Sequence, residues 1–400
     1  MKVVFYSNFL NHHQLPFCLA MQKLTKNQFT FVATEPIPQE RLSMGYYDMN
    51  KSYPFVLTTY DFMENEMMAR ELAVQCDVMI TGSAPEIYTE IRMRENRLTF
   101  RYYERVYKEG LYRALRPRSI ASQLLHHTRF ARKQLYVLCA SSYTAFDFSL
   151  TGAYVGKTYK WGYFPEVKKQ DKDMLFEMKH IKKRPVILWV GRLIPWKHPE
   201  TMIELAHYLK SQGKLFDINI IGNGELEEKL SGMIRERQLE DCVHMLGAMS
   251  PEAVRNYMEM ADIFTFTSDY NEGWGAVLNE SMCSGCAVIA SHAIGAAGFL
   301  IEHGKNGFIY PDGEQARLNE MVIQLLDNAS LREKLGREAC KTLETEWNAE
   351  TAAQRLLDLC EVLQKGEKTP FKTGPCSAAA RISNGRARRE ARKTESVMGR

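Results

Sequence analysis

The sequence of 400 residues has no long apolar segment, little net charge and no cysteine pattern that suggests disulfides. No apolar run is long enough to cross a bilayer, and residues 1–7 become polar too soon for a signal peptide. A net charge of only +4 does not by itself indicate a nucleic-acid partner. Nine scattered cysteines are typical of a reducing compartment. These absences predict a cytoplasmic globular protein.

Three familiar ligand-binding patterns are either missing or out of place. The loop after the first expected strand, 2–6, lacks the glycines of a dinucleotide fingerprint, so the sequence does not support NAD. The Asp-x-Asp motif at 171–173 lies in a polar segment rather than at a strand end, and we interpret it as coincidental. The single Cys-x-x-Cys motif at 283–286 fits the small residues of a packed helix better than a metal or redox site. We expect neither a metal nor a cofactor.

The chain is too long for one ordinary core, and its pattern predicts two domains of α/β structure. Short apolar strands alternate with helices in both halves, which predicts parallel sheets covered on both faces. We place the domains at 1–165 and 166–348, with a polar linker over 164–185. An amphipathic helix follows at 349–364. The basic tail 365–400 lacks apolar periodicity, so we expect it to be disordered.

Two glutamates bracket an expected strand-to-helix turn in the second half. The run 263–267 is typical of a buried strand, and 276–283 has helical composition. Glu272 falls in the turn and Glu280 about two turns along the helix. A helix start over a parallel strand binds anions, and the carboxylates would bind sugar hydroxyls beside them. Taken alone, the pair fits solvated or paired glutamates equally well.

Two further loops follow strands of the same half. Arg192 and Lys197 share one strand-to-helix loop, where two cations would bind a diphosphate. Two solvated loop cations are the alternative. The turn Gly222-Asn223-Gly224 allows a backbone to approach a ligand closely.

Loops of the first half offer candidate substrate contacts. His12 and His13 follow the first strand, and Ser83 lies in the turn after the strand 77–81. All three therefore lie at carboxyl ends of strands, where ligands bind in such sheets. One histidine would face the substrate, and ordinary surface-loop histidines are the alternative.

Residues 101–133 are strongly basic, with apolar and aromatic residues interleaved at near-helical spacing. Arg113, Arg116 and Arg118 lie at the centre of this segment. The pattern fits a helix on an anionic membrane surface, which we favour. A solvated basic face and a polyanion such as RNA are the alternatives. No nucleic-acid motif accompanies the segment, so we expect no nucleic-acid partner.

Together, the motifs of the second half resemble the nucleotide-sugar domain of the retaining glycosyltransferase family 4, within the group 1 glycosyltransferases. Four motifs match in order: Gly191-Arg192-Leu193 with Lys197, Ile221-Gly222-Asn223-Gly224, Glu272-x7-Glu280, and 285–289 followed by Gly295 and Asn306-Gly307-Phe308. The resemblance covers residues 186–364. It implies the GT-B fold, with two Rossmann-like doubly wound domains facing across a cleft. The first domain would bind the acceptor, and the helix 349–364 would pack back on it.

The resemblance also implies roles for particular residues. Arg192 and Lys197 would bind the donor diphosphate, Glu272 the donor hexose and Glu280 the ribose. The turn from Gly222 to Gly224 would lie near the nucleobase. Backbone N–H groups would bind the phosphates at Gly273, Trp274, Gly275 and Ala276.

The activity implied is metal-independent transfer of a hexose from a nucleoside diphosphate sugar, with retention, at the inner face of the membrane. The acceptor would be a lipid-linked saccharide or a growing surface glycan. The sequence departs from the family pattern at 11–14, at His198 and at 295–299, where a glycine turn, a glycine and an acidic residue are common. Another GT-B enzyme, such as an epimerase or phosphorylase, and a non-catalytic partner that binds nucleotide or glycan are the alternatives.

Overall fold

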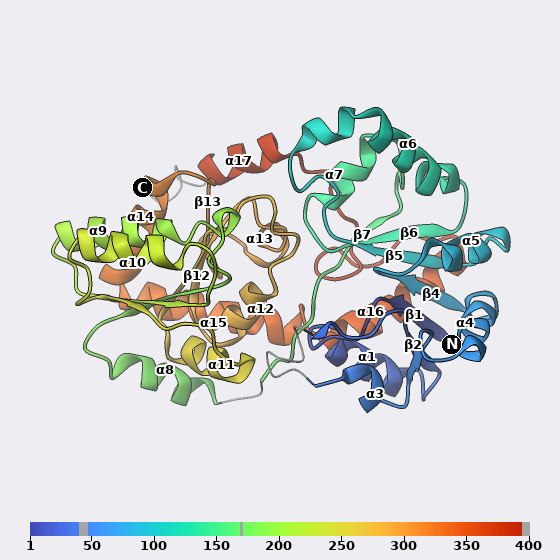
Figure 1. The fold of residues 1–400 in the computed structure, drawn as a ribbon, viewed down its shortest axis with the longest axis horizontal. Coiled ribbons are helices and arrows are strands. Elements are labelled where there is room, and N and C mark those ends of the chain that lie inside the picture. Colours follow the sequence, from blue (N-terminus) through green and yellow to red (C-terminus); the bar gives the residue numbers. More distant parts are fainter. Residues whose placement is uncertain (40–46, 169–170, 394–400) are drawn as a thin grey trace. The chain divides into compact units, whose positions relative to one another are not determined.

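The computed structural model describes residues 1–39, 47–168 and 171–393, and the chain divides into two compact units (Figure 1). The first unit contains residues 1–166 and 346–382. The second contains 167–345 and the described residues from 383 onward. The chain thus passes from one unit to the other after residues 166, 345 and 382.

A seven-stranded parallel sheet forms the first unit, in the order β3-β2-β1-β4-β5-β6-β7. Its strands are β1 (Val3–Ser7), β2 (Phe29–Ala33), β3 (Val56–Thr58), β4 (Val78–Thr81), β5 (Thr99–Tyr103), β6 (Leu135–Cys139) and β7 (Thr158–Lys160). Strand β1 pairs with both β2 and β4. The strand order therefore reverses between β1 and β4, and the loops after these strands meet at a switch point, where such sheets bind ligands.

Helices of the first unit cover this sheet. They are α1 (Leu15–Leu24), α3 (Met49–Ser52), α4 (Met63–Gln75), α5 (Glu86–Arg94), η1 (Leu111–Leu115), α6 (Pro117–His126), η2 (Thr128–Phe130), α7 (Thr144–Ser149) and α16 (Ala349–Gln364). The side chain of Asn348 caps α16 by accepting a hydrogen bond from the N–H of Thr351. The buried apolar face of α16 packs on α1. The first helix of the chain and its last long helix are thus in contact within the first unit.

The second unit contains a six-stranded parallel sheet in the order β10-β9-β8-β11-β12-β13. Its strands are β8 (Val186–Val190), β9 (Asp217–Ile221), β10 (Val243–Met245), β11 (Ile263–Phe266), β12 (Ala287–Ser291) and β13 (Phe308–Tyr310). These strands are short and rich in β-branched and aromatic residues, as buried parallel strands usually are. The order reverses between β8 and β11, which places a second switch point there.

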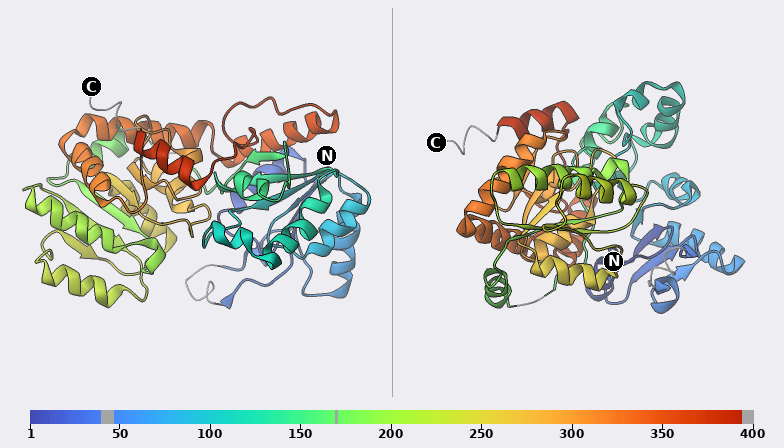
Figure 2. Two further views of the ribbon diagram at one scale, coloured as in Figure 1. Left: turned by 90° about the horizontal axis from the view of Figure 1, so that it is seen from above. Right: turned by 60° about the vertical axis from the view of Figure 1, so that its left-hand side comes forward.

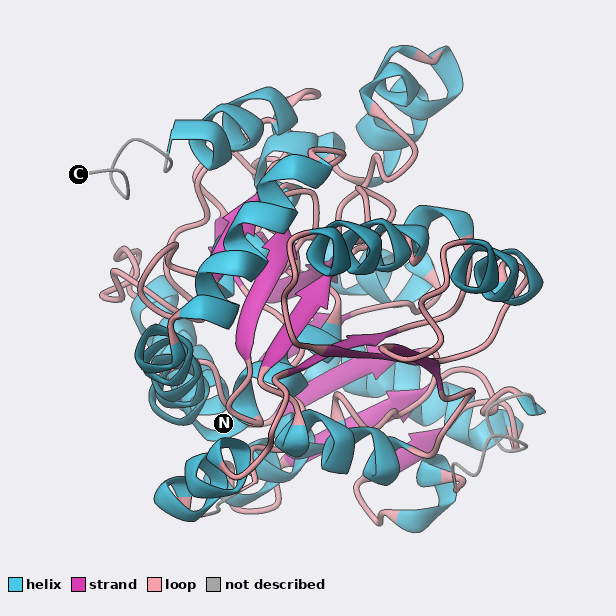
Figure 3. Ribbon diagram, turned by 90° about the vertical axis from the view of Figure 1, so that its left-hand side faces the viewer, coloured by secondary structure: helices cyan, strands magenta, loops and turns pink. Residues whose placement is uncertain are grey.

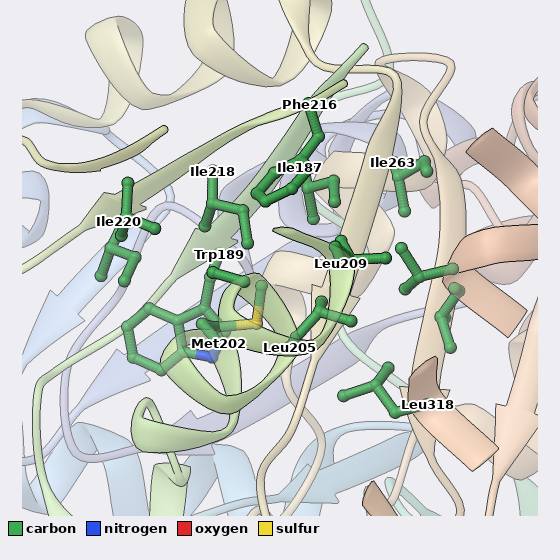
Figure 4. Packing of buried hydrophobic residues seen from close by; sticks show 14 of the residues in the cluster. Ile187, Trp189, Met202, Leu205, Leu209, Phe216, Ile218, Ile220, Ile263 and Leu318 are labelled. Atoms are coloured by element: carbon green, nitrogen blue, oxygen red, sulfur yellow. The ribbon is translucent and has the colours of Figure 1, made fainter. Parts of the chain in front are cut away.

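Helices lie on both faces of this sheet (Figure 3). They are α8 (Lys172–His180), η3 (Pro195–Lys197), α9 (Glu200–Ser211), α10 (Glu227–Glu236), α11 (Pro251–Met260), α12 (Ala276–Cys283), α13 (Ala297–Leu300), α14 (Gln315–Asp327), α15 (Ala329–Thr345) and α17 (Asn384–Lys393). In the core, Trp189 and Ile218 of the sheet pack with Met202 and Leu205 of α9 (Figure 4). Burial of this apolar layer fixes the strand ends that carry the loops.

The expectation of a disordered tail over 365–400 is wrong for its described part. Residues 376–379 pair with β7, because the N–H of Lys160 donates to the carbonyl of Ser377 and the N–H of Ala379 donates to that of Thr158. Residues 384–393 then form α17, which contacts β13 of the second unit. Tertiary contacts with a sheet edge and with an acidic side chain order a segment that has no apolar periodicity of its own. The expectation for 394–400 lies outside the described residues.

Two other details differ from the sequence expectation. The expected linker 164–185 contains α8, which packs on α11. Strands β3, β5 and β7 were missed, because β3 and β7 are short edge strands and β5 carries Arg101 within the basic segment. Within the described part of the chain, none of the helices has both the length and the apolarity that membrane crossing requires.

Candidate active site

Three loops of the second unit meet at the carboxyl edge of its sheet. Strand β8 lies between β9 and β11, so the loops 191–198, 222–225 and 267–275 that follow these strands are neighbours. These loops carry the cations, the glycine turn and the first glutamate of the sequence motifs. Their common position is the switch point, where ligands bind in open α/β sheets.

Gly222 and Gly224 allow the loop after β9 to pack against the loop after β8. Both have positive φ, at 139° and 154°. A Cβ on Gly222 would lie 1.8 Å from the carbonyl oxygen of Gly191, and one on Gly224 would lie 2.5 Å from that of Leu193. The N–H of Leu193 donates to the carbonyl of Asn223 at 2.8 Å. The glycines therefore fix the loop that carries Arg192, and their closeness to a nucleobase stays a prediction.

Lys197 and Glu272 form an ion pair between the loops after β8 and β11. Each side chain is only 12% exposed. The Ser268 hydroxyl donates to the same carboxylate oxygen at 3.1 Å, and the Lys197 ammonium lies 4.6 Å from the centre of the Trp196 ring. The pair holds a cation and a carboxylate together at the switch point. Arg192, earlier in the same loop as Lys197, is exposed.

His198 has a left-handed backbone, with φ of 51°. Glycine adopts this conformation without strain, which gives a physical reason for the glycine that the resemblance leads us to expect here. The imidazole lies between Asp269, 3.6 Å from Oδ2, and Glu200, 3.2 Å from Oε1. Hydrogen bonds to Asp269 and then to Glu200 raise the pKa of His198 to about 10. The charged ring thus ties the loop after β8 to the loop after β11 at neutral pH.

The start of α12 depends on Gly275, which has a φ of 90° and occupies the N-cap position. A Cβ there would lie 2.5 Å from the ring of Phe266. The side chain of Trp274 is fully buried and donates from Nε1 to Asn279 at 2.9 Å, and the expected phosphate contact of its backbone N–H stays a prediction. The N–H groups that open α12 follow this turn, since the first turn of a helix leaves its N–H groups without intrahelical partners.

Glu280 lies in α12, and this helix packs on α11. Burial raises the pKa of the Glu280 carboxyl to about 7, and the guanidinium of Arg255 on α11 acts in the opposite direction. The Arg255 side chain is itself buried. Sequence reasoning missed Arg255, because a single arginine on an amphipathic helix carries no motif.

In the first unit, Asn11 shapes the loop that carries the two histidines. Its Oδ1 accepts hydrogen bonds from the N–H groups of His13 and Gln14, at 3.0 and 3.1 Å. The imidazole centres of His12 and His13 lie 3.7 Å apart, and that of His13 lies 5.8 Å from the ring centre of Tyr163. Both histidines are half-buried at the β1 end of the switch point. Their contact with a substrate stays a prediction.

Ser83 lines a cavity of about 710 Å³ at the same switch point. The cavity is also lined by Ser7, Asn8, Phe9, Asn11, Gln14, Glu35, Gly82, Ala84, Pro85, Tyr102, Tyr103, Glu104, Arg105 and Tyr163. The Tyr163 hydroxyl donates to Glu104 at 2.9 Å. The charge of Arg105 is paired with the buried Asp147, 3.3 Å away. Sequence reasoning found only the loops of this cavity, because the tyrosines come from β5 and from residues after β7.

The basic segment 101–133 is not one helix, which corrects the sequence expectation. Arg101 lies in β5, is buried, and pairs with Glu86. After η1, Arg116 and Arg118 are exposed, whereas Arg113 within η1 pairs with Glu109. Exposed apolar side chains accompany them at Tyr112, Leu115, Ile120, Leu124 and Leu125. The alternation of basic and apolar residues in the sequence therefore spans two different structures. One is the buried strand β5, and the other is the exposed helical segment 111–130, which we call the excursion.

The Asp-x-Asp motif has a structural role, and both cysteines of the Cys-x-x-Cys motif are buried. Asp171 caps α8, because its Oδ1 accepts hydrogen bonds from the N–H groups of Asp173 and Met174. Asp173 pairs with Arg337 of α15 at 2.8 Å. Cys283 and Cys286 are free and buried. The carboxylates at 171 and 173 are therefore engaged in helix capping and an ion pair.

Residues 171–342 match the family model described as glycosyl transferases group 1. This part of the second unit therefore resembles the domain of group 1 glycosyltransferases. Arg192, Lys197, Glu272 and Glu280 all lie inside the matched region, whereas the histidine loop lies outside it. The two parallel sheets flanked by helices are those of the GT-B fold.

Known glycosyltransferases resemble this chain over a limited length. The amylovoran biosynthesis glycosyltransferase AmsK of Erwinia amylovora is 34% identical over 182 residues, which are 44% of each chain. The alpha-D-kanosaminyltransferase of Streptomyces kanamyceticus is 30% identical over 173 residues, which are 43% of this chain and 44% of that protein. The aligned regions span less than half of these relatives. The crystal structure of Anabaena Alr3699/HepE in complex with UDP is similar in fold, with a TM-score of 0.66 at 17% identity, and covers 90% of this chain and 100% of that one.

Proposed function

We propose that the protein is a retaining glycosyltransferase of family 4 that transfers a hexose from a nucleoside diphosphate sugar during the synthesis of a surface polysaccharide. The observation that carries this proposal is the Lys197–Glu272 pair at the β8/β11 switch point. This pair brings together a cation, which we assign to the diphosphate, and a carboxylate, which we assign to the sugar. The name of AmsK supports polysaccharide synthesis as the pathway class.

Stabilisation of the leaving diphosphate is the main chemical task. Lys197, Arg192 and the N–H groups at the start of α12 supply positive charge to the phosphates as the glycosidic bond breaks. Glu272, freed from Lys197 by the incoming diphosphate, accepts hydrogen bonds from hexose hydroxyls. The acceptor hydroxyl attacks from the face that the diphosphate leaves, and a phosphate oxygen takes its proton. This route uses no protein nucleophile and no metal.

Nucleotide recognition is assigned to Glu280 and to the turn Gly222–Gly224. The Glu280 carboxylate accepts hydrogen bonds from ribose hydroxyls, and the glycine turn lies beside the base. UDP is the first nucleotide to test, because the similar fold of Alr3699/HepE was crystallised with UDP.

The acceptor is assigned to the 710 Å³ cavity of the first unit. Tyrosine rings at Tyr102 and Tyr163 offer apolar faces for sugar rings, and the carboxylates of Glu35 and Glu104 accept hydrogen bonds from hydroxyl groups. The one arginine of the lining is neutralised by Asp147. These groups favour a neutral saccharide end, with His13 beside it.

The lipid part of a lipid-linked acceptor is assigned to the excursion 111–130. Exposed Leu115, Leu124 and Leu125 lie on the same segment as exposed Arg116 and Arg118. Apolar side chains with cations beside them are the groups that enter the interface of an anionic bilayer. Arg105 of the cavity lining lies a few residues before Leu111, where this segment begins.

Calorimetric titration with UDP, GDP and ADP in the presence of EDTA tests the function. We expect one nucleotide to bind at micromolar concentration and Glu280→Ala to abolish that binding. Incubation of the corresponding nucleotide-sugar with an acceptor should then give an α- or β-linked product that keeps the donor's anomeric configuration. If folded protein binds none of the three nucleotides, the proposal fails and a non-catalytic role is favoured.

A further inference from the structure

The C-terminal helix α17 is anchored on the second unit by two arginines. Arg392 Nε donates to Glu314 Oε1 at 2.7 Å, and Arg388 lies 3.4 Å from the same oxygen. Arg388 Nη2 also donates to the carbonyl oxygen of Asp312 at 3.3 Å. Ala391, between the two arginines, is buried. Figure 2 shows α17, in red, along the orange segments of this unit.

Asp312 is joined in turn to His292, the residue that follows β12. The N–H of Asp312 donates to Nδ1 of His292 at 2.9 Å, and the N–H of His292 donates to the carbonyl of Tyr310 at 2.9 Å. The His292 side chain is buried. Because Nδ1 accepts a hydrogen bond, the neutral ring carries its proton on Nε2.

His292 therefore donates from Nε2 to the hydroxyl of Tyr270, 2.8 Å away. The two rings meet edge to face, with their centres 5.6 Å apart. If Nδ1 carried a proton, it could not accept the hydrogen bond from the N–H of Asp312, and two donors would face each other. Burial, and then the charge of Arg388, lower the pKa of His292 to about 4. The geometry and the charges thus agree on one neutral tautomer.

Tyr270 belongs to the loop 267–275, whose backbone sets the place of Glu272. The N–H of Asp269 donates to the carbonyl of Trp196 at 3.0 Å, and the N–H of Glu272 donates to the carbonyl of Asp269 at 3.1 Å. One end of this loop is thus held by the loop after β8. Tyr270 is held from the other side, by the residues after β12 and β13.

We propose that α17 is a positioning element for Glu272. Arg388 fixes the turn at Asp312, this turn fixes His292 in one tautomer, and His292 holds Tyr270 and its loop. The consequence for donor binding rests on the proposed function, whereas the ordering of the loop does not. Arg388, Asp312, His292 and Tyr270 are positioning residues, since none of them is assigned a contact with the donor.

Hydrogen exchange of the ligand-free full chain, followed by mass spectrometry, tests the ordering. In Arg388→Ala, peptides that contain 268–275 should exchange at least several-fold faster than in the wild type. Arg389→Ala is the matched control, because it removes the same charge from the same helix without breaking a described contact to Asp312 or Glu314. The Arg388 side chain is 46% exposed, so its replacement leaves the core intact. Equal exchange in both variants would overturn the proposal.

Tyr270→Phe provides an independent variant, since it removes only the hydroxyl that His292 contacts. Calorimetry with the nucleotide that the wild type binds should show about a twofold to thirtyfold loss of affinity in Tyr270→Phe and in Arg388→Ala. The double variant should lose less than the product of the two single losses, because both act on one chain of contacts. Multiplicative losses would refute the chain. If the wild type binds no nucleotide, the proposed function fails, and hydrogen exchange still decides the positioning role.

Discussion

Lys197 and Glu272, 75 residues apart in the sequence, meet as an ion pair between two neighbouring loops of the second unit. Both side chains are only 12% exposed. Removing one partner leaves the other charge partly buried without compensation, which is more costly than removing both. Stability and activity should therefore respond differently to changes at this pair.

Lys197→Met and Glu272→Gln should each lower the free energy of unfolding by about 1–3 kcal/mol. The double variant should regain part of this loss. Transfer activity should fall about a hundredfold to a thousandfold in Lys197→Met, because a charge that stabilises the leaving diphosphate is lost, and the double variant should not recover it. Urea unfolding and initial-rate assays measure the two effects. Lys210→Met, on the exposed face of α9, is the control, and unchanged activity in Lys197→Met would contradict the assigned role.

Gly222→Ala should be strongly destabilising. A Cβ would meet the carbonyl oxygen of Gly191 at 1.8 Å, so the loop after β8 has to move. We expect a loss of about 3 kcal/mol or more, from strain and overpacking together. Gly213→Ala is the control, because Gly213 also has positive φ, at 65°, but open space where its Cβ would lie. It should lose only about 1–2 kcal/mol, the cost of a left-handed backbone at alanine, and equal losses in urea unfolding would argue against the close loop contact.

The stabilising effect of His198 should depend on pH. Its pKa in the folded protein is about 10, above the ordinary value of 6.5, because Asp269 and Glu200 hold the charged ring. The folded state therefore binds the proton more tightly. The stabilisation is complete below pH 6.5 and is lost as the pH rises toward 10.

His198→Asn should accordingly reduce stability most below pH 6.5, and the difference from the wild type should shrink between pH 6.5 and 10. Asparagine tolerates a left-handed backbone, so the comparison isolates the charge. Urea unfolding at several pH values measures it. His207→Asn, exposed on α9, is the control, and a difference that stays constant with pH would refute the ion pairs of His198.

Glu104→Gln should weaken acceptor binding without affecting the nucleotide. The carboxylate lines the cavity of the first unit and accepts a hydrogen bond from Tyr163. Loss of charge-assisted hydrogen bonds to saccharide hydroxyls should raise the acceptor KM about tenfold or more. Glu95→Gln, exposed after α5, is the control. A raised Kd for the nucleotide with an unchanged acceptor KM would place the acceptor elsewhere.

Replacing Arg113, Arg116 and Arg118 by glutamine should weaken binding to vesicles that contain anionic lipid. Each cation near such a surface contributes about 1 kcal/mol, so the partition coefficient should fall by at least tenfold, less so at high salt. The control replaces three cations of the second unit, Lys210, Lys229 and Arg235. Equal partition of the two triple variants in flotation assays would exclude the excursion 111–130 as the membrane contact.

Local sequence patterns were sufficient for the loops of the second unit. The strands before Arg192 and Gly222 are short and followed directly by glycine, and the strand before Glu272 is short and rich in β-branched and aromatic residues, so both the strands and the loops could be predicted. Parallel strands then bring their carboxyl ends to one edge. The first unit was less predictable, because its edge strands β3 and β7 are short and β5 contains Arg101, whose burial depends on Glu86.

The sequence by itself determined that the chain forms two α/β sheets and which loops carry charge, because hydrophobic periodicity and glycine positions are local properties. Tertiary structure alone decided which charges meet. It paired Lys197 with Glu272, buried the side chain of Trp274, and drew the basic helix α17 onto Glu314. A charge without a partner is stable in water, but its burial costs free energy unless an opposite charge lies beside it. Packing between segments far apart in the chain therefore selects its partner.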